Sequence, residues 1–574
     1  MHNDCNRGRG WRYPGANTMK PAVNQPSVAS FRQVVLWPVQ LMQQGDDQKI
    51  QQHWQSLVAA AGKTPWKSVS DEFTSAGAQF SERRYREFVT FLPFAQRFLY
   101  GEGIRGEDDG SYRSSPIHVF SRSDVTGVRI KFGDDPQPVT FGVDHVDLYF
   151  FYDIDVAILV VELLGEHLPL ARAQNTMFRF GRAYPSHWEA SGRGGHCAEK
   201  VEWLNKNGEV LAASDYEEKQ RYLKFAREQR VPRIASHWEY LMQPLVQHYS
   251  DQEGEIRYRE IEYQRMPLMS YLALDNISQL TRGDLIRLGL VTRPGDANTL
   301  PYSEGFLRDF ESRYCYDSHW HDGQQQSPDN MRFSCNGQNF IVIGSAEDST
   351  FTDKEAGVVS QFRHQYFLLF LIAHFQKAAL LMLSDRLVHA ISRLDIDDPA
   401  SVRAFRNSVN HTQEIFLRFT HRYWFHAVSD QAQTRDLFTM MLRHLETGDL
   451  FERTRRRILD MTQYLDSEQS KLHTEIVVRL TVVTAFGLIG TVVTGILGMN
   501  LFAEAENTPL TKLWYFMLAF IPTTALVLLT IVKSRRLSAF LDALSDENLG
   551  WGAKLRVFIN VWGKKTETDP AKDD

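Results

Sequence analysis

Cysteine is scarce in this 574-residue chain, and its spacing is irregular. Cys5, Cys197, Cys315 and Cys335 are too few and too far apart to form a disulfide framework. A chain without such a framework suits a reducing compartment, because structural disulfides belong to oxidising ones. We therefore expect the water-soluble part of the protein to be cytosolic.

Signatures of several functional classes are missing as well. The formal net charge is −6 and the basic residues are scattered, so nucleic acid is not an expected partner. No Gly-x-x-x-x-Gly-Lys-Ser/Thr sequence offers a nucleotide-binding loop, and no catalytic motif indicates an enzyme. The first basic residues precede no apolar core, so we expect no secretory signal and interpret residues 1–30 as a solvated tail.

Long apolar runs are absent from most of the chain, whose mean hydropathy is −0.35, but two occur near its end. Residues 477–499 contain no acidic side chain and only Arg479 as a basic one, and residues 513–532 contain no charged side chain. Each can form a helix that crosses a bilayer, which needs about 20 apolar residues. The short connection between them predicts a tight turn on one side of the membrane.

Charge predicts how the two segments are oriented. Basic residues stand on their outer flanks, at Lys471, Arg479, Lys533, Arg535 and Arg536. The connecting loop carries Glu504 and Glu506 against Lys512. By the positive-inside rule, both ends of the chain are expected in the cytoplasm. The two glutamates either concentrate cations at this loop or are ordinary solvated side chains.

The sequence pattern of the cytosolic body predicts a mixed α/β (α+β) fold. Runs of β-branched and aromatic residues predict strands at residues 34–37, 88–92, 117–120, 128–132, 148–152, 156–163, 256–265 and 340–343. Apolar residues that recur every three or four positions predict helices at 168–184 and 217–248. From 356 to 500 the pattern predicts long helices broken only near 397–399 and 447–449.

These elements divide the chain into five parts: the tail, an α/β domain at 31–355, a helical hairpin and stalk at 356–475, a two-helix membrane domain at 476–533 and a cytosolic extension at 534–574. The apolar stretch 367–383 is interrupted by His374, Gln376 and Lys377, so we interpret it as a buried helix rather than a third span. The extension carries Trp551, Phe558 and Trp562 on one helical face, which fits either the inner membrane surface or the protein body.

Small residues form one face of the first apolar segment. On a helix, positions spaced alternately three and four apart form a stripe, here Val477, Leu480, Thr484, Gly487, Thr491, Thr494 and Gly498. Two interpretations stay open. Such residues let membrane helices pack closely, or the stripe lines a pore. Two spans cannot enclose a pore alone, so a channel would require several copies of the chain.

The tripeptide Gly498-Met499-Asn500 closes this segment. It stands at the non-cytosolic end of the penultimate span, before a short loop, a last span and basic residues. This arrangement resembles the CorA family of magnesium transporters. The resemblance implies a homopentamer in the inner (plasma) membrane, with a cytosolic funnel, long stalk helices and an inner ring of first spans that conducts divalent cations.

The resemblance also implies roles for single residues. It places the selectivity filter at the tripeptide, a hydrophobic constriction at Val477 and Leu480, and a polar ring at Thr474, while Thr491 and Thr494 match polar pore-wall positions. Mg²⁺ sheds water reluctantly, so Asn500 oxygens are expected to accept hydrogen bonds from the ion's own waters. No bound cofactor is expected beyond a divalent cation as cargo and regulator.

The chain departs from the family in ways that leave the ion open. Leu497 stands where many members have an aromatic residue, and the loop lacks the Met-Pro-Glu-Leu sequence of magnesium-selective members. Mg²⁺, with Co²⁺ or Ni²⁺, is the first expectation. Zn²⁺ transport, as in the ZntB branch, is an alternative, and a non-conducting membrane-anchored sensor or scaffold is another.

Three further clusters have metal or catalytic chemistry. Asp395, Asp397 and Asp398 match the chemistry of a regulatory Mg²⁺ site, although a helix-ending turn with solvated charges explains them better. Zinc ligands could come from Cys315, Asp317, His319, His321, Asp322 and Cys335, but their spacing matches no finger or ribbon. His187, His196 and Cys197 could pair a thiol with a base, but a polar loop explains them more simply.

Overall fold

The computed structural model describes residues 26–42, 52–69, 82–101, 116–296, 299–321, 330–396 and 398–503, with parts of 508–525. The chain divides into two compact units, unit 1 up to Ile458 and unit 2 from Leu459, and each is described by itself. Strand β1 begins at Ser27, so the expected tail is wrong in its last residues. The rest of the tail and the extension at 534–574 lie outside the described residues.

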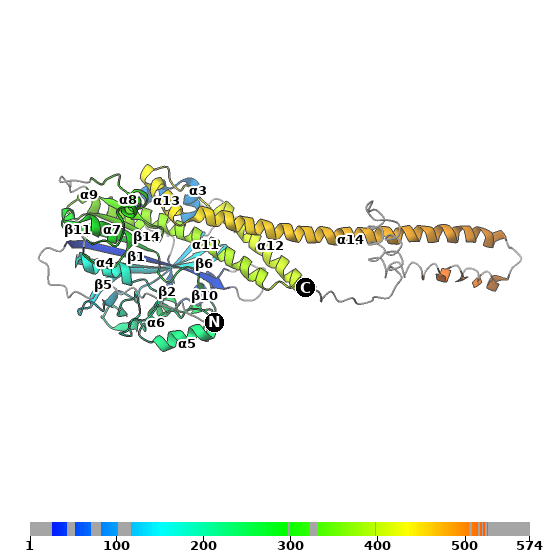
Figure 1. Ribbon diagram of the computed structural model, residues 1–574, viewed down its shortest axis with the longest axis horizontal. Coiled ribbons are helices and arrows are strands. Elements are labelled where there is room, and N and C mark those ends of the chain that lie inside the picture. The colour runs from blue at the N-terminus through cyan, green and yellow to red at the C-terminus, as the bar shows by residue number, and fades with distance from the viewer. Residues whose placement is uncertain are drawn as a thin grey trace, which may run out of the picture. The chain divides into compact units, whose positions relative to one another are not determined.

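A large mixed sheet forms the centre of unit 1 (Figure 1). Its strands are β1 (Ser27–Met42), β2 (Trp66–Ser68), β3 (Ile117–Arg122), β4 (Gly127–Lys131), β5 (Val139–Phe151), β6 (Ile154–Pro169), β7 (Lys200–Leu204), β8 (Val210–Ala213), β9 (Val246–Gln247), β10 (Arg257–Glu260), β11 (Leu268–Leu274), β12 (Cys315–Tyr316), β13 (Arg332–Cys335) and β14 (Asn339–Ser345). Their main order is β12-β13-β14-β11-β1-β6-β5-β4-β7-β8, and the predicted mixed α/β class is confirmed.

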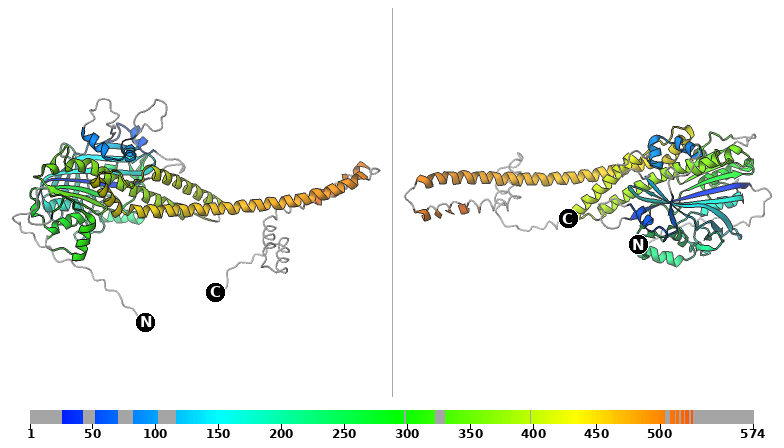
Figure 2. Two further views of the ribbon diagram at one scale, coloured as in Figure 1. Left: turned by 90° about the horizontal axis from the view of Figure 1, so that it is seen from above. Right: turned by 180° about the vertical axis from the view of Figure 1, so that it is seen from behind.

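Helices cover both faces of this sheet (Figures 1 and 2). The helices of the described residues are α1 (Trp54–Ala59), α2 (Glu82–Thr90), α3 (Pro93–Tyr100), α4 (Leu170–Arg179), α5 (Lys219–Gln229), α6 (Ser236–Met242), α7 (Arg282–Leu290), α8 (Glu304–Tyr314), α9 (Ser349–Thr352), α10 (Val358–Gln361), the π-helix η2 (Phe362–Tyr366), α11 (Phe367–Ser392), α12 (Pro399–Arg422) and α13 (Ala432–His444), with a short 3₁₀ turn η1 (Ile277–Gln279). The last helix, α14 (Thr447–Ala503), begins in unit 1 and lies mostly in unit 2.

The central strands are buried on both sides, so they read as continuous apolar runs. On one face, Trp37 of β1 packs edge-on against Trp238 of α6, with ring centroids 6.2 Å apart. On the other face, Phe151 of β5 stacks on Phe375 of α11 at 3.8 Å. Helix α11 lies along β1 and β6, so the sheet and the helical hairpin form one unit rather than separating near residue 356.

The helix α11 answers the question of a third span. Val358–Ser392 is the one candidate span by length and composition in the described part of the chain, but 78% of its most apolar window is buried inside the protein. Phe375 and Leu383 are fully buried. The interpretation of 367–383 as a core helix is confirmed, because its apolar surface is already covered by the sheet.

Three local predictions are wrong. The helix expected at 217–248 is divided into α5 and α6 and is followed by β9. Residues 88–92 were expected as a strand, but α2 extends to Thr90, and its buried positions Glu87 and Thr90 are three residues apart, as one face of a helix requires. The long helical region also breaks between α12 and α13. There the buried Gln376 side chain donates to the carbonyls of Tyr423 and Phe425, at 2.9 and 3.3 Å, which supports a non-helical backbone without Gly or Pro.

Candidate functional site

The tripeptide Gly498-Met499-Asn500 lies in the last two turns of α14. The helix was expected to end at the tripeptide and instead continues to Ala503, while its start at Thr447 agrees with the predicted break at 447–449. One uninterrupted helix therefore connects residue 447 to the tripeptide. The side chains of the tripeptide lie outside the described residues, as do Glu504 and Glu506.

The stripe on this helix is open to the surroundings. In the single chain Val477 is 60% exposed and Leu480 is 65% exposed. Thr474, Thr484 and Thr491 are exposed as well, and nothing lies within 4 Å of the position where a Cβ on Gly487 would stand. An apolar surface of this kind needs lipid or another protein chain to cover it.

The threonine hydroxyls of the stripe are turned back onto the helix. Thr484 Oγ1 donates to the Leu480 carbonyl at 2.7 Å, and Thr491 Oγ1 donates to the Gly487 carbonyl at 2.9 Å. Thr474 makes the equivalent bond to Ser470. Because each hydroxyl proton is already used, the oxygen lone pairs remain as acceptors. A row of acceptors suits a ligand that donates hydrogen bonds, such as the water shell of a cation.

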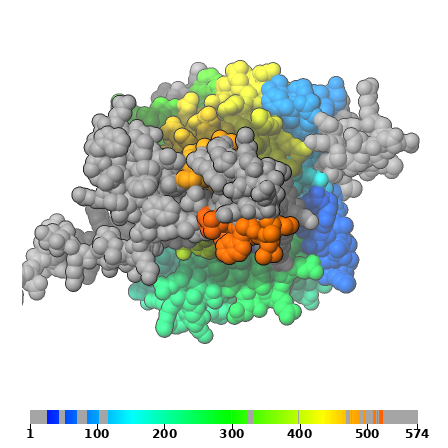
Figure 3. Space-filling view, turned by 90° about the vertical axis from the view of Figure 1, so that its right-hand side faces the viewer, coloured from blue at the N-terminus to red at the C-terminus, as the bar shows by residue number. Residues whose placement is uncertain are grey.

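The second apolar segment is equally exposed. Among its described residues Trp514 is 67% exposed, Leu518 62% and Ile521 59%, and Figure 3 shows residues of this segment at the surface in orange. An apolar hollow of about 530 Å³ lies along it. The described parts of unit 2 thus carry large apolar side chains that the single chain leaves bare.

The acidic turn before α12 has a structural use. Both carboxylate oxygens of Asp398 accept backbone N–H groups, from Ala400 at 2.9 Å and from Ser401 at 3.1 Å, so Asp398 caps the helix. The backbone N–H of Asp395 donates to the Ser401 hydroxyl. Asp397 lies outside the described residues. The cap explains Asp398 without a metal ion.

A charged cluster that the sequence did not reveal lies on β5 and β6. Ligand atoms of Asp144, His145 and Glu162 all lie within 4.8 Å of one another. Arg32 donates to Glu162 at 2.7 Å, and Arg363 pairs with Asp144. Burial disfavours the imidazolium, but the hydrogen bond to Asp144 and the surrounding carboxylates outweigh it and raise the pKa of His145. The two arginines neutralise the carboxylates, so the charges of the cluster balance one another without a metal ion.

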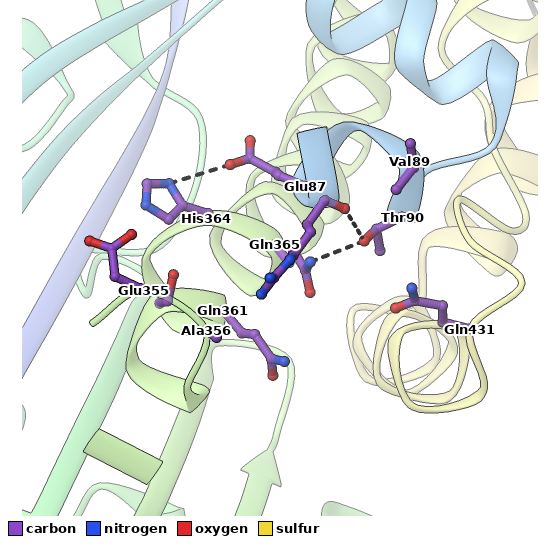
Figure 4. Close-up of a pocket in the computed structure, with 11 residues that line it drawn as sticks. Glu87, Val89, Thr90, Glu355, Ala356, Gln361, His364, Gln365 and Gln431 are labelled. Atoms are coloured by element: carbon purple, nitrogen blue, oxygen red, sulfur yellow. Dashed lines mark hydrogen bonds and ion pairs between the residues drawn. The ribbon is translucent and has the colours of Figure 1, made fainter. Parts of the chain in front are cut away.

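A polar cavity of about 280 Å³ lies between α2 and η2 (Figure 4). Glu87 extends across it toward His364, with 3.5 Å between Oε2 and Nδ1, and also accepts the Tyr100 hydroxyl at 2.7 Å. Gln365 donates to the Thr90 hydroxyl at 3.0 Å. These contacts occupy the Glu87 carboxylate, and they fasten α2 to the π-helix.

The suggested zinc ligands are engaged elsewhere. Asp317 holds Arg332 through two hydrogen bonds of 2.8 and 2.7 Å, and His321 contacts Asn330 at 3.2 Å. Cys315 and Cys335 are free thiols whose pKa burial raises, to about 11 and about 12. Asp322 lies outside the described residues.

The suggested pairing of the Cys197 thiol with His187 or His196 as a base is not arranged for catalysis. Ser186 Oγ lies 2.9 Å from His187 Nδ1 and 3.4 Å from His196 Nδ1. Burial and the neighbouring arginines lower the pKa of His196 to about 4. Burial raises the pKa of the Cys197 thiol to about 12, so it is protonated at neutral pH. These residues form a polar loop, not an activated nucleophile.

No family model and no curated protein matches the chain. The function is therefore argued from the residues and the geometry above.

Proposed function

We propose that the protein is a CorA-type channel of the inner membrane that admits divalent cations as a homopentamer. The observation that carries the proposal is the tripeptide Gly498-Met499-Asn500 at the end of an apolar helix, followed by a short loop and a second apolar segment. The bare apolar side chains of unit 2 support it, because a bilayer and neighbouring copies would cover them.

The proposed conduction path is the stripe of α14. Five copies would set Thr474, Thr484 and Thr491 around one axis, with Val477 and Leu480 as the constriction. The threonine oxygens keep their acceptor capacity, which suits an ion that travels with its water. Asn500 would form the filter by accepting hydrogen bonds from that water, and Glu504 and Glu506 would raise the cation concentration at the entrance.

Passive entry is sufficient for transport. With both chain ends in the cytoplasm, a doubly charged ion that crosses about 100 mV, negative inside, gains about 4.6 kcal/mol. The cytosolic unit 1 would then act as the gate. Asp395, Asp397 and Asp398 stay candidates for a regulatory cation only as part of this proposal.

The test is uptake of Mg²⁺, Co²⁺, Ni²⁺ and Zn²⁺ into proteoliposomes under an inside-negative potential. We expect Mg²⁺ uptake by the native protein and at least a tenfold loss in Asn500→Ala, because the filter loses its acceptors. Asn507→Ala is the matched control, since it removes the same side chain from the connecting loop and should leave uptake unchanged.

Other outcomes separate the alternatives. Zn²⁺ uptake that responds to a pH gradient, with little Mg²⁺ uptake, would assign the chain to ZntB-like transport. Correctly assembled protein that passes none of the four ions would overturn the channel proposal and favour a membrane-anchored sensor or scaffold.

A further inference from the structure

A second cavity in unit 1 has the character of a ligand site. It measures about 320 Å³ and lies among the end of α7, one side of α8 and the β13–β14 turn. Its lining combines one arginine, three amide side chains and three aromatic rings. Binding pockets for small molecules share this make-up, with apolar walls and a few polar groups.

The arginine of this cavity is Arg265. Its guanidinium donates to the Val291 carbonyl at 3.3 Å. In the described part of the chain no carboxylate lies within ion-pair distance of it, and no other acceptor takes its remaining N–H groups. Burial and the nearby Arg182 lower the pKa of Arg265 to about 9. Arg265 is half-buried and lines the cavity, and a cation in such a place without an anion is less stable than a paired one.

The surroundings add positive charge instead of cancelling it. Arg182 is joined to Arg265 by an isolated β-bridge and is only 4% exposed. Its Nε and Nη2 donate to the Phe178 carbonyl, at 3.3 and 3.0 Å, and not to an acid. The guanidinium of Arg293 lies 5.6 Å from the centre of the Phe178 ring. Among the described residues none of these three arginines has a carboxylate partner, so the local potential favours an anion.

The opposite wall is aromatic. Phe306 lines the cavity and is 44% exposed, which is high for a phenylalanine ring on a folded domain. Phe310 and Tyr314 stack at 5.3 Å, with an angle of 17° between their planes. Tyr314 also stacks on His444 at 4.2 Å and Phe306 on Tyr302 at 5.0 Å, so a flat ligand would use the second face of Phe306.

One amide of the lining lacks a partner. Asn339 is 2% exposed, its Nδ2 donates to the Gly289 carbonyl at 3.3 Å, and its Oδ1 accepts from none of the described residues. A buried polar atom of this kind is uncommon in a folded protein. A ligand that carries an N–H or O–H donor beside its anionic group would satisfy this oxygen.

We propose that this cavity binds a small organic anion with one planar ring system, single or fused, its carboxylate or phosphate held by Arg265 and its ring system lying against Phe306 and Phe310. The volume sets the size, because it lies at the lower end of the range for ligand pockets. The site is independent of transport and lies wholly within unit 1.

Titration calorimetry on the full-length protein in detergent tests the proposal. The probes are benzoate against neutral benzamide, adenosine monophosphate against adenosine, and inorganic phosphate alone. We expect at least one ring-bearing anion to bind at least tenfold more tightly than its neutral counterpart. Binding of benzoate would identify a carboxylate ligand, and binding of the nucleotide a phosphate ligand.

Three variants locate the binding. Arg265→Gln should weaken the anion at least tenfold, because a hydrogen bond to a charged group is lost. Phe306→Ala, at a side chain already exposed, should weaken ring-bearing anions and leave inorganic phosphate unchanged. Arg308→Gln is the matched control, since it removes the same charge from α8 at a side chain that is 77% exposed and outside the cavity.

Three results would overturn the proposal: no binding of any of the three anions to the native protein, equal binding of charged and neutral partners, or undiminished binding in Arg265→Gln. If Arg265→Gln does not fold, the comparison of benzoate with benzamide and the Phe306→Ala variant decide the question on folded protein.

Discussion

Asp155 connects the sheet to two helices, and its replacement by asparagine should measurably destabilise unit 1. The carboxylate stands near the start of β6 and is buried, with 4% of its side chain exposed. It pairs with Arg386 of α11 and lies 3.1 Å from His53 Nε2, just before α1. Asp155→Asn keeps the shape but removes the charge, which leaves the Arg386 guanidinium, itself only 14% exposed, without its anion.

The expected size follows from the burial of both partners. Breaking a buried ion pair costs about 3–5 kcal/mol, and the isosteric amide favours the lower end, about 3 kcal/mol. Unit 1 extends to Ile458, and at about 2.1 cal/mol/K per residue its unfolding entropy is about 1 kcal/mol/K. Asp155→Asn should therefore lower the Tm by about 3 °C.

Thermal unfolding of the full-length protein in detergent, followed by tryptophan fluorescence, measures this shift. Asp135→Asn is the control, because Asp135 pairs with Arg172 at 2.8 Å but both side chains are partly exposed. Such a pair contributes at most about 1 kcal/mol, so its loss should lower the Tm by no more than about 1 °C. Equal shifts in the two variants would refute the argument from burial.

The loss of stability caused by Asp155→Asn should also depend on pH. Burial alone would raise the pKa of Asp155, but Arg386 and His53 outweigh it and lower the pKa. A lowered pKa means that the stabilisation is present above the unfolded value of about 3.9 and is lost as the pH falls through the folded value. The difference between native protein and Asp155→Asn should thus be full at pH 7 and shrink below about pH 4.

Two more substitutions test the burial of other groups. Burial raises the pKa of Glu260 to about 8, although the hydrogen bond from Tyr184 opposes this shift. The stability of the native protein should therefore fall as the pH rises from about 4.3 to 8. Glu260→Gln should match the native Tm at pH 4 and exceed it at pH 9, and parallel plots of Tm against pH for the two proteins would contradict this. Phe375→Ala removes a fully buried ring that stacks on Phe151 and should cost about 3–5 kcal/mol, whereas Ile396→Ala, at a side chain 70% exposed, should leave the Tm unchanged.

The sequence predicts those helices and strands whose structure depends on their own residues rather than on contacts with distant ones. Strands β3 to β6 are rich in β-branched and aromatic residues. Most of β6 is buried on both faces and β5 is buried mainly at alternate positions, so local preference and tertiary packing agree. Helix α2 was missed because Phe88-Val89 favours a strand locally, while the buried face of the helix is set by Glu87 and Thr90. The break between α12 and α13 was missed because its support comes from Gln376, far away in the sequence.

The candidate sites also differ in whether their residues are close together in the sequence. The stripe of α14 and its tripeptide are contiguous, so their spacing along one helix could be read directly. The cavity around Arg265 is assembled from residues near 265, 290, 306–314 and 336–339, and no local spacing connects them. The Asp144 cluster depends on the register of β5 against β6, in which His145 stands opposite Glu162 after a bulge.

The position of β1 has a consequence for synthesis on the ribosome. β1 ends at Met42, yet its partners along both edges are β6, complete at Pro169, and β11, complete at Leu274. At about 5–20 residues per second, the 232 residues from Met42 to Leu274 take roughly 12–46 s to make. During that interval the apolar strand has left the ribosome without its full set of partners. We expect the nascent chain to depend on chaperones until β11 is complete, well before the apolar segments of unit 2 are translated.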